Sequence, residues 1–557
     1  MIDSRYFTPL LNLDEWEQTP KGILAEVDGW MAKVECLKPS LFRVEIWEEG
    51  RSDPEPQHAV IKDLSELSCP FEVAETPDTI TLQTGEASLT VHRAPFALVG
   101  KRADGSVFLD TRTEGGLGAY SFINDTFAVS RSRCQDEIIL GLGEKTGPMN
   151  RNGRTYMLWN MDVLSPGLLG ELNFDPSGGD PKQDPTSTVF DPYYISIPFY
   201  QSVDIEGRAT ASFIDNVRRA HYDFSQEGRT EIRFEGGRYA EFFFAGPDLK
   251  QILFDYTELT GRIQAPPLWA LGYHHCRWAP YHQDDVLAKA KTYREKNLPC
   301  DSFWLDIDHM EGYRVFTWNS KLFPRPTEML SSLKEMGFRC VTIIDPGVKH
   351  EPGYSVFDSG LAKGVFCRTD SGAVYQGQVW PGRTAFPDFV NPDARSWWGD
   401  YNAKHVEFGL AGIWNDMNEP ATGDIPPYGM RFGSGRYSHE AYHNAYALLM
   451  AMGTVEGLRK AMPDKRTFVL SRAGSAGIQR YAANWLGDNM SRWDHLEMSV
   501  TMSLGMGLSG QAFVGADIGG FCEQSNGELL ARWYQAACLA PFCRNHRSEE
   551  HTSELQS

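Results

Sequence analysis

The sequence lacks the features of a secreted, membrane-bound or zinc-binding protein. Its first residues, "MIDSRYFTPLLNLDEW", contain no basic segment followed by an apolar core, so no signal peptide is predicted. No apolar run approaches the ~18 residues that a membrane-spanning helix needs. The ten cysteines are scattered, without a C-x-x-C pair or a zinc-type histidine spacing. We therefore expect a reduced, cytoplasmic, soluble protein with no membrane partner.

Positive charge is also scarce. The chain has 53 Lys and Arg against 74 Asp and Glu, a formal net charge of −21, which argues against a nucleic-acid partner. Aromatic residues are numerous, with 15 Trp, 22 Tyr and 31 Phe. They suit stacking on sugar rings, although packing in large cores explains many of them equally well. The length of 557 residues exceeds a single core and predicts two to four domains.

Residues 1–250 have the pattern of a β-sandwich domain. Apolar and polar residues alternate, interrupted by Gly, Asp and Pro, in "TITLQTGEASLTVHRAPFALV", "RATASFIDNVRRAHYDF" and "TEIRFEGGRYAEFFFAG". This alternation predicts antiparallel strands with one buried face. A Gly/Asp/Pro-rich stretch at 163–190 predicts a long loop.

Residues 251–546 change to alternating strands and helices. Helical segments such as "DDVLAKAKTYREKN", "EMLSSLKEMG", "SHEAYHNAYALLMAMGTVEGLRKAM" and "GELLARWYQAACLA" separate apolar strand segments. Eight such units predict a closed (β/α)8 barrel, with an inserted loop region at about 350–392. The alternative is a doubly wound open sheet, which the absence of a Gly-rich phosphate-binding fingerprint disfavours. The predicted strands are 270–278, 300–308, 339–346, 411–417, 466–472, 483–488, 511–518 and 541–546.

Functional side chains of such a barrel lie at the carboxyl ends of its strands. Here the successive predicted ends carry Trp278, Asp306 and Asp308, Asp345, Asp416, Arg472, Asp488, Asp517 and His546. An acidic ring could hold calcium or magnesium, but the adjacent Arg472 and the nearby tryptophans suit a sugar better. There is no H-E-x-x-H motif, so we expect neither a metal nor another cofactor.

Two carboxyl groups in different protonation states are what glycoside hydrolysis requires. Asp416, in "GIWNDMNEP", and Asp488, in "WLGDNMS", each end a predicted strand, two strands apart around the barrel. They can therefore face each other across one pocket. The positive charge of Arg472 would keep a carboxylate such as Asp416 ionised, whereas apolar neighbours would favour the protonated form of Asp488.

The chain resembles the α-glucosidases of glycoside hydrolase family 31 over most of residues 140–546. "GIWNDMNE" matches the nucleophile motif of that family. The other matching segments, in chain order, are "GLGEKTG", "LWNMD", "PPLWALGYHHCRW", "FWLDIDHM", "VWPGRTAFPDF", "SRAGSAGIQRYAANWLGDN", "GADIGGF" and "PFCRNH".

The resemblance implies a galactose-mutarotase-like sandwich before the barrel, with Asp416 as nucleophile and Asp488 as general acid/base of a retaining α-glucosidase. Their carboxyl groups are then expected about 5–5.5 Å apart. It implies that Asp162 reaches subsite +1, and that Ile307 and Asp308 favour glucose over xylose. The other implied substrate-binding residues are Asp306, Arg472, Asp517, His546, Trp278, Trp380, Trp414, Met417, Trp485 and Phe521. The implied partner is an oligosaccharide or α-glucoside.

Several roles stay open at this point. Glu419 is a candidate catalytic acid but also a candidate anchor of its loop. Asp308 and Asp345 could cap loops, and Trp414 and Trp485 could serve core packing. The same site would also suit an α-transglucosylase, an α-xylosidase, an α-glucan lyase or a non-catalytic carbohydrate-binding protein. The oligomeric state does not follow from the sequence.

The sequence departs from the family pattern at three places. The loop after "LWNMD" is longer than expected, and His309 stands where Tyr often follows the Asp pair. The terminal run "RSEEHTSELQS", 547–557, looks like translated adapter sequence, so we expect the natural chain to continue past His546 into an eighth helix and further β domains. A fragment lacking that helix should express poorly. A natural disordered tail is the alternative.

Overall fold

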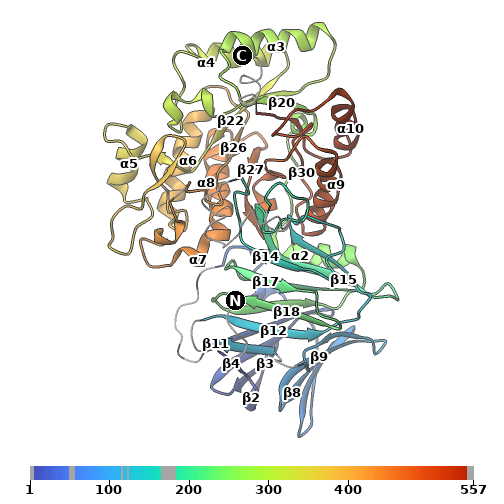
Figure 1. Cartoon of the computed structure of the whole chain (residues 1–557). Coiled ribbons are helices and arrows are strands. Elements are labelled where there is room, and N and C mark those ends of the chain that lie inside the picture. Colours follow the sequence, from blue (N-terminus) through green and yellow to red (C-terminus); the bar gives the residue numbers. More distant parts are fainter. Residues whose placement is uncertain are drawn as a thin grey trace.

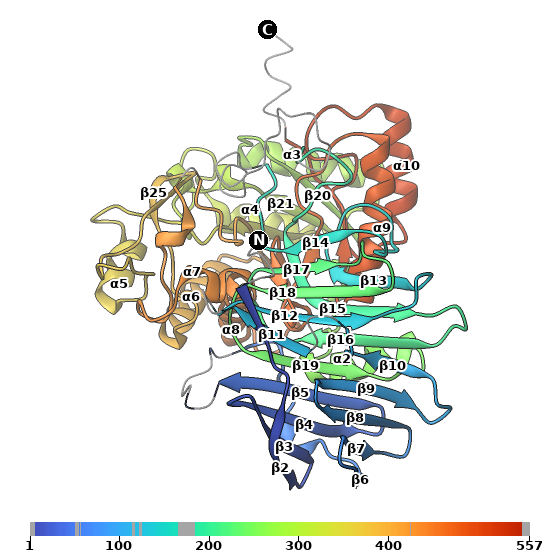
Figure 2. The same ribbon diagram turned by 60° about the horizontal axis from the view of Figure 1, so that its bottom comes forward.

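An N-terminal domain of β-sheets lies against a barrel of strands and helices (Figures 1 and 2). This arrangement is that of a computed structural model, and no helix in the part of the chain it describes is long and apolar enough to cross a membrane. The structure describes residues 6–48, 50, 55, 57–113, 117–121, 125–164, 184–423 and 425–548.

The N-terminal domain is built from antiparallel strands in three sheets. One sheet has the order β1 (Phe7–Pro9), β11 (Leu117–Ser121), β12 (Phe127–Ser132), β18 (Arg229–Phe234), β17 (Ala220–Asp223) and β14 (Thr155–Leu158). A second has the order β10 (Val107–Asp110), β9 (Phe96–Arg102), β8 (Ala87–Arg93), β7 (Thr79–Gln83) and β6 (Glu72–Glu75). The third runs β13 (Ile138–Gly143), β15 (Ile195–Val203), β16 (Ala209–Ile214), β19 (Tyr239–Phe244), β5 (Leu41–Glu48), β4 (Trp30–Lys38), β3 (Gly22–Val27) and β2 (Leu13–Thr19).

The alternating pattern explains how these sheets pack. In β7 and β8 every second residue is buried, so Ile80, Leu82, Leu89 and Val91 face the core. They join one apolar cluster with residues of all three sheets. The predicted antiparallel sandwich is confirmed. Helix α2 (Leu249–Thr260), whose first turn is capped by Asp248, follows and leads into the barrel.

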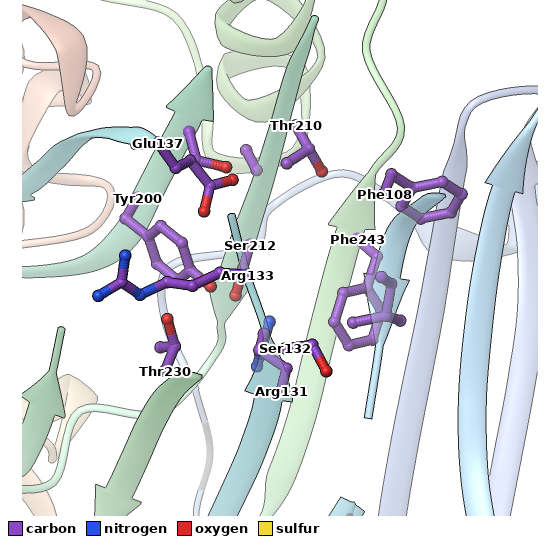
Figure 3. A pocket seen from close by; sticks show the side chains of 13 residues that line it. Phe108, Arg131, Ser132, Arg133, Glu137, Tyr200, Thr210, Ser212, Thr230 and Phe243 are labelled. Carbon is purple, nitrogen blue, oxygen red and sulfur yellow. The ribbon is translucent and has the colours of Figure 1, made fainter. Parts of the chain in front are cut away.

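A small cavity lies inside the sandwich (Figure 3). Its volume of about 40 Å³ leaves space for roughly one water molecule, not for a sugar. Arg131 lines it and forms an ion pair of 2.7 Å between Nη2 and Oε1 of the fully buried Glu241. The cavity wall therefore includes one member of a structural ion pair, and the space is too small for a sugar ligand.

The second domain is a closed parallel barrel. Around it run β30 (Val514–Gly515), β29 (Ala483–Trp485), β27 (Val469–Ser471), β26 (Gly412–Asn415), β22 (Arg339–Ile344), β21 (Ser302–Leu305), β20 (Tyr273–Arg277) and β31 (Cys543–Asn545). A parallel bridge between Asp517 and Arg544 joins the last strands and closes the ring. All eight predicted strand segments contain one of these strands, and the open-sheet alternative is excluded.

Helices surround the barrel. They are α3 (Gln283–Glu295), α4 (Pro326–Glu335), α6 (Pro392–Val406), α7 (His439–Tyr442), α8 (Tyr446–Ala461), α9 (Trp493–Leu508) and α10 (Gly527–Ala537). Neither α6 nor α9 belongs to the predicted helical segments. Helix α6 buries polar residues such as Asn402 and His405 alongside its tryptophans, so its sequence lacks a clear apolar stripe.

The inserted region between β22 and α6 has secondary structure of its own. It contains β23 (Val348–Lys349), α5 (Ser355–Lys363), β24 (Gly377–Val379) and β25 (Gly382–Ala385), and the three strands form a small antiparallel sheet. The sequence predicted only loop here. Short strands and a nine-residue helix give little periodic signal, which explains the difference.

The two domains are joined by backbone pairing as well as by side chains. Strand β15 of the sandwich pairs in parallel with β28 (Gly474–Ser475), which follows β27 of the barrel. The side-chain amide of Asn160 donates to the carbonyl oxygens of Asn444 and Gly474 at 3.2 and 3.1 Å. Trp159 stacks on His443 with 3.6 Å between ring centroids. The sandwich is thereby fixed next to the rim of the barrel.

Helices α6 and α8 approach each other through glycines. A Cβ atom placed on Gly457 of α8 would lie 2.1 Å from the carbonyl oxygen of Gly399 in α6. Because the obstacle is helix backbone, no side chain can turn away to relieve the clash. The contact therefore needs glycine at both positions.

We predict that Gly457→Ala lowers the midpoint of thermal unfolding, because forcing the helices apart costs about 1–3 kcal/mol. The matched control is Gly507→Ala in α9, where an added Cβ meets no atom within 4 Å. The control should be neutral or slightly stabilising, since Ala is the better helix former. Equal effects of the two substitutions on the unfolding midpoint would contradict the packing argument.

Candidate active site

A cavity of about 320 Å³ opens at the carboxyl ends of the barrel strands. This volume is within the usual range of small-molecule sites. Among the described residues, the predicted site residues that line it are Asp162, Trp278, Asp306, Ile307, Trp380, Trp414, Asp416, Met417, Arg472, Asp488, Phe521 and His546. Four lining residues were not predicted, namely Leu164, Ile343, Cys522 and Ser548. Four predicted residues do not line it, namely Asp308, Glu419, Trp485 and Asp517.

The guanidinium group of Arg472 is the electrostatic centre of the cavity. It follows β27 and is almost fully buried. Its Nε lies 3.1 Å from Oδ1 of Asp416 and its Nη1 lies 3.8 Å from Oδ2 of Asp488. The two acids therefore face the same guanidinium across one pocket, on the same rim of the barrel. Their expected separation of about 5–5.5 Å stays a prediction.

Glu419 neutralises Arg472 from behind the cavity wall. Nε and Nη2 of Arg472 donate to the two carboxylate oxygens of Glu419 at 2.8 and 2.9 Å. Glu419 has no exposed surface and does not line the cavity. This bidentate geometry is that of an anchor. A catalytic acid must reach a substrate oxygen, and nothing in this geometry lets Glu419 do so.

Asp416 and Asp488 differ in their surroundings. Burial raises the pKa of Asp416, but the charge of Arg472 and a hydrogen bond from the backbone N–H of Met417, 2.7 Å from Oδ1, oppose this shift. Burial raises the pKa of Asp488 well above its usual range, and the more distant Arg472 opposes it less. The pair is therefore set to hold its proton on Asp488.

Asp306 and His546 form a second polar group on the opposite wall. Oδ2 of Asp306 lies 3.3 Å from Nε2 of His546. Burial raises the pKa of Asp306 to about 6 and lowers that of His546 to about 3, so the imidazole is neutral near pH 7. A neutral imidazole beside a carboxyl group offers a donor and an acceptor to hydroxyl groups.

Cys276 lies next to this pair. Potential ligand atoms of Cys276, Asp306 and His546 all fall within 4.8 Å of one another, a spacing that would suit a metal ion. However, burial raises the pKa of the Cys276 thiol well above its usual range, although the charge of Arg544 opposes the shift. The fixed positive charge of Arg544 acts on this thiol and disfavours a cation bound beside it. The trio suits a neutral polar ligand better.

Asp517 lies behind the wall rather than on it. Its Oδ1 accepts from Nη2 of Arg544 at 2.8 Å, and both side chains are fully buried. The Arg544 guanidinium lies over the rings of Trp414 and Trp485 at 4.4 and 5.1 Å. Trp414 contributes to both the core and the cavity, whereas Trp485 lies only in the core. The sequence did not single out Arg544, because a strand residue two positions before His546 carries no signal of its own.

Aromatic rings form the rim. Trp278, which follows β20, lies parallel to Phe521 with 6.2 Å between centroids and meets Trp380 edge to face at 5.3 Å. Trp380 is carried by the turn between β24 and β25 and is 43 % exposed. The inserted sheet therefore supplies one wall of the cavity. Such a rim is apolar enough to pack against the carbon-bound hydrogens of a ring.

The sandwich contributes Asp162 and Leu164 to the cavity lining and supports the site through Tyr194. Oδ2 of Asp162 lies 3.3 Å from Nη2 of Arg472, and the Arg472 guanidinium lies 5.1 Å from the ring centre of Tyr194. Tyr194 also packs under Gly487, where φ is +57° and a Cβ atom would meet the ring at 2.0 Å. Tyr194 thus supports the turn that carries Asp488. Its position in "DPYYISIP" held no signal for this role, because it depends on the contact between domains.

Two further predicted features lie at the edge of the described part. Most of the predicted loop at 163–190 falls on residues 165–183, which lie outside the described residues. In the terminal run, the carbonyl oxygen of Arg547 accepts from the N–H of Trp278 at 3.0 Å, and the N–H of Ser548 donates to the carbonyl of Phe521 at 3.0 Å. Residues 549–557 lie outside the described residues.

Comparison with known families agrees with this geometry. Residues 263–556 match the TIM-barrel domain of glycosyl hydrolases family 31. Residues 31–223 match the glycosyl hydrolase 31 N-terminal galactose mutarotase-like domain. The two matched domains correspond to the barrel and the sandwich.

Individual relatives give the same result. The chain is 36 % identical over 543 residues to alpha-glucosidase 2 of Bacillus thermoamyloliquefaciens, covering 96 % of this chain and 66 % of the relative. It is 41 % identical over 413 residues to human neutral alpha-glucosidase AB, an alignment that covers 72 % of this chain and 43 % of the relative. A family 31 dextranase of Flavobacterium johnsoniae, solved with isomaltotriose, superposes with a TM-score of 0.86 and 26 % identity. The match covers 98 % of this chain and 66 % of the dextranase chain. The chain thus spans two thirds or less of these relatives.

We predict that Glu419→Ala strongly destabilises the protein, because it leaves the buried Arg472 charge without its bidentate partner. Asp162, Asp416 and Asp488 still balance the charge, so the cost is that of the lost charge-assisted hydrogen bonds, about 1.5–3 kcal/mol each. Glu419→Gln keeps the shape and one acceptor, but its amide NH2 group faces the other Arg472 donor, so it should recover only part of the loss. Thermal unfolding of both variants measures this; an unchanged midpoint for Glu419→Ala would contradict the anchoring role.

Proposed function

Because the chain belongs to glycosyl hydrolase family 31, we propose that it releases terminal non-reducing α-linked glucose from α-glucosides with retention of configuration. The observation that carries this proposal is the placement of Asp416 and Asp488 on one buried guanidinium in the barrel cavity. The names of the relatives, alpha-glucosidases of bacterial and human origin, support glucose as the sugar.

The reaction proceeds in two displacements. The Asp416 carboxylate attacks C1 of the glucose ring while Asp488 gives its proton to the glycosidic oxygen, so the C1–O bond breaks and the leaving group departs as an alcohol. A β-glucosyl ester on Asp416 remains. Asp488, now ionised, takes a proton from water, whose oxygen attacks C1 and releases Asp416. Two inversions restore the α configuration, and no cofactor is needed.

The electrostatics of the site support this division of roles. A nucleophile must be charged, and Asp416 has the shorter contact to Arg472 and the backbone donor. The acid must be protonated before attack, and Asp488 has the more strongly raised pKa. Formation of the ester removes a negative charge beside Arg472, which makes ionisation of Asp488 easier at the moment it must act as base.

The rest of the cavity provides binding groups for one glucose ring. Asp306 and His546 offer hydrogen bonds to hydroxyl groups, while Trp278 and Phe521 pack on the ring. Asp162 also lines the cavity, next to Arg472, and would contact the leaving group. We keep Ile307 and Asp308 as the residues that favour glucose over xylose, Ile307 through its place on the cavity wall.

We predict that Asp416→Ala lowers kcat for p-nitrophenyl α-glucoside on the order of 10⁴-fold or more, because the nucleophile is removed. Binding of glucose, measured by calorimetry, should stay within a few-fold of the unchanged protein. A variant that hydrolyses at a near-normal rate would refute the assignment of Asp416.

We predict that the effect of Asp488→Ala depends on the leaving group. Loss of an acid catalyst costs about 10²–10⁴-fold for maltose, whose alcohol must be protonated, and much less for the ester-forming step with α-glucosyl fluoride. Because burial raises the pKa of Asp488, kcat/KM for maltose should fall as the pH rises through that pKa. With α-glucosyl fluoride as substrate, Asp488→Ala should lack this alkaline limb. Retention of the limb would assign the proton to another group.

A further inference from the structure

One buried acid beside the nucleophile has no part in the reaction described above. Asp345 follows β22, is 3 % exposed and does not line the cavity. Its Oδ1 is buried without a hydrogen-bond partner among the described residues. No backbone N–H in the described part of the chain donates to its carboxyl group, which is the bond that a loop cap requires. An acid buried in this way is costly unless something compensates it.

The strand register places Asp345 next to Asp416. Ile344 pairs with Asn415 in parallel strands β22 and β26, and the N–H of Asp416 donates to the carbonyl of Ile344 at 3.4 Å. The next residues along both strands are Asp345 and Asp416. Neighbouring strands lie about 4.8 Å apart, so the backbones of Asp345 and Asp416 lie side by side. Asp416 also carries the largest of the charges that act on the Asp345 carboxyl group, so the two acids lie near each other.

On the basis of the proposed function, we propose that Asp345 remains protonated and donates its hydrogen to the Asp416 carboxylate, which keeps the nucleophile ionised and oriented. Asp345 is then a positioning residue, because it acts on the substrate only through Asp416. No bond to Asp345 forms or breaks during turnover. As the glucosyl ester is cleaved, negative charge returns to Asp416 and the hydrogen bond strengthens, which favours this step.

The surrounding charges favour the proton on Asp345. Two carboxylates sharing a buried site cannot both ionise cheaply. The groups that act on Asp345 are Asp416, Arg472, Asp306 and Glu419. Among the described residues, Arg472 forms ion pairs with Asp416, Glu419, Asp162 and Asp488, and none with Asp345. Burial, followed by the charge of Asp416, raises the pKa of Asp345 well above its usual range.

The test compares Asp345→Asn and Asp345→Ala by the pH dependence of kcat/KM for α-glucosyl fluoride. The asparagine amide is neutral and donates a hydrogen bond. The acid limb, which is the fall of kcat/KM at low pH as Asp416 becomes protonated, should therefore stay within a few tenths of a pH unit of its wild-type position. Alanine removes the donor, so Asp416 should protonate more readily and the acid limb should move to higher pH by about one unit, with a lower kcat/KM. Asp345→Leu replaces Asp345→Ala if thermal unfolding shows that the latter is not folded.

The control is Asp388→Asn, which changes another buried aspartate that accepts from the N–H groups of Gly433 and Ser434 at 3.1 and 2.8 Å. It should lower the unfolding midpoint without moving the acid limb. If Asp345→Asn moves the limb to lower pH, Asp345 is ionised in the native enzyme and the inference is wrong. If the acid limb of kcat/KM lies at the same pH in both Asp345 variants, Asp345 has only a structural role. If the wild-type protein shows no activity on any α-glucoside, the proposed function is wrong instead.

Discussion

The site depends on one buried guanidinium group. Removing the Arg472 charge from water costs several kcal/mol, and only close, well-oriented acids offset this. Four carboxyl groups lie within 4.0 Å of it, belonging to Asp162, Asp416, Glu419 and Asp488. One cation cannot balance four anions in a dry cavity. The surplus of acid is therefore the physical reason why one member of the group keeps a proton, and the one with the longest contact, Asp488, is the member best placed to do so.

This centre is shared between two domains. The barrel supplies Arg472 from β27, while the sandwich supplies Asp162 and the Tyr194 ring. The pairing of β15 with β28 begins two residues after Arg472 and fixes the sandwich next to this part of the barrel. The same tyrosine fills the space under Gly487, which precedes the acid. The sandwich is consequently part of the active site, because without it both the orientation of Arg472 and the turn carrying Asp488 would lose their support.

The sequence predicted the parts of this structure that repeat. Eight apolar strand segments separated by helices were enough for the barrel, and the polar residues at their ends located most of the cavity wall. What it missed depends on contacts between segments far apart in the chain. Tyr194 and Arg544 are placed by tertiary packing, and Ile343 and Cys522 have no motif. Asp517 ends a strand as predicted, yet its side chain turns to Arg544 behind the wall. Strand ends predict the level of a residue, not the direction of its side chain.

The two buried arginines show how charge balance separates structural from reactive groups. Arg544 meets one acid, Asp517, at contact distance and is enclosed by Trp304, Trp414, Trp485 and Phe542. That pair is neutral and sealed, so neither member has reason to change its protonation state during turnover. The Arg472 guanidinium lines the cavity, and the acids around it outnumber its single positive charge. Asp488 can therefore give up its proton and regain it at low cost, which is what the proposed double displacement requires.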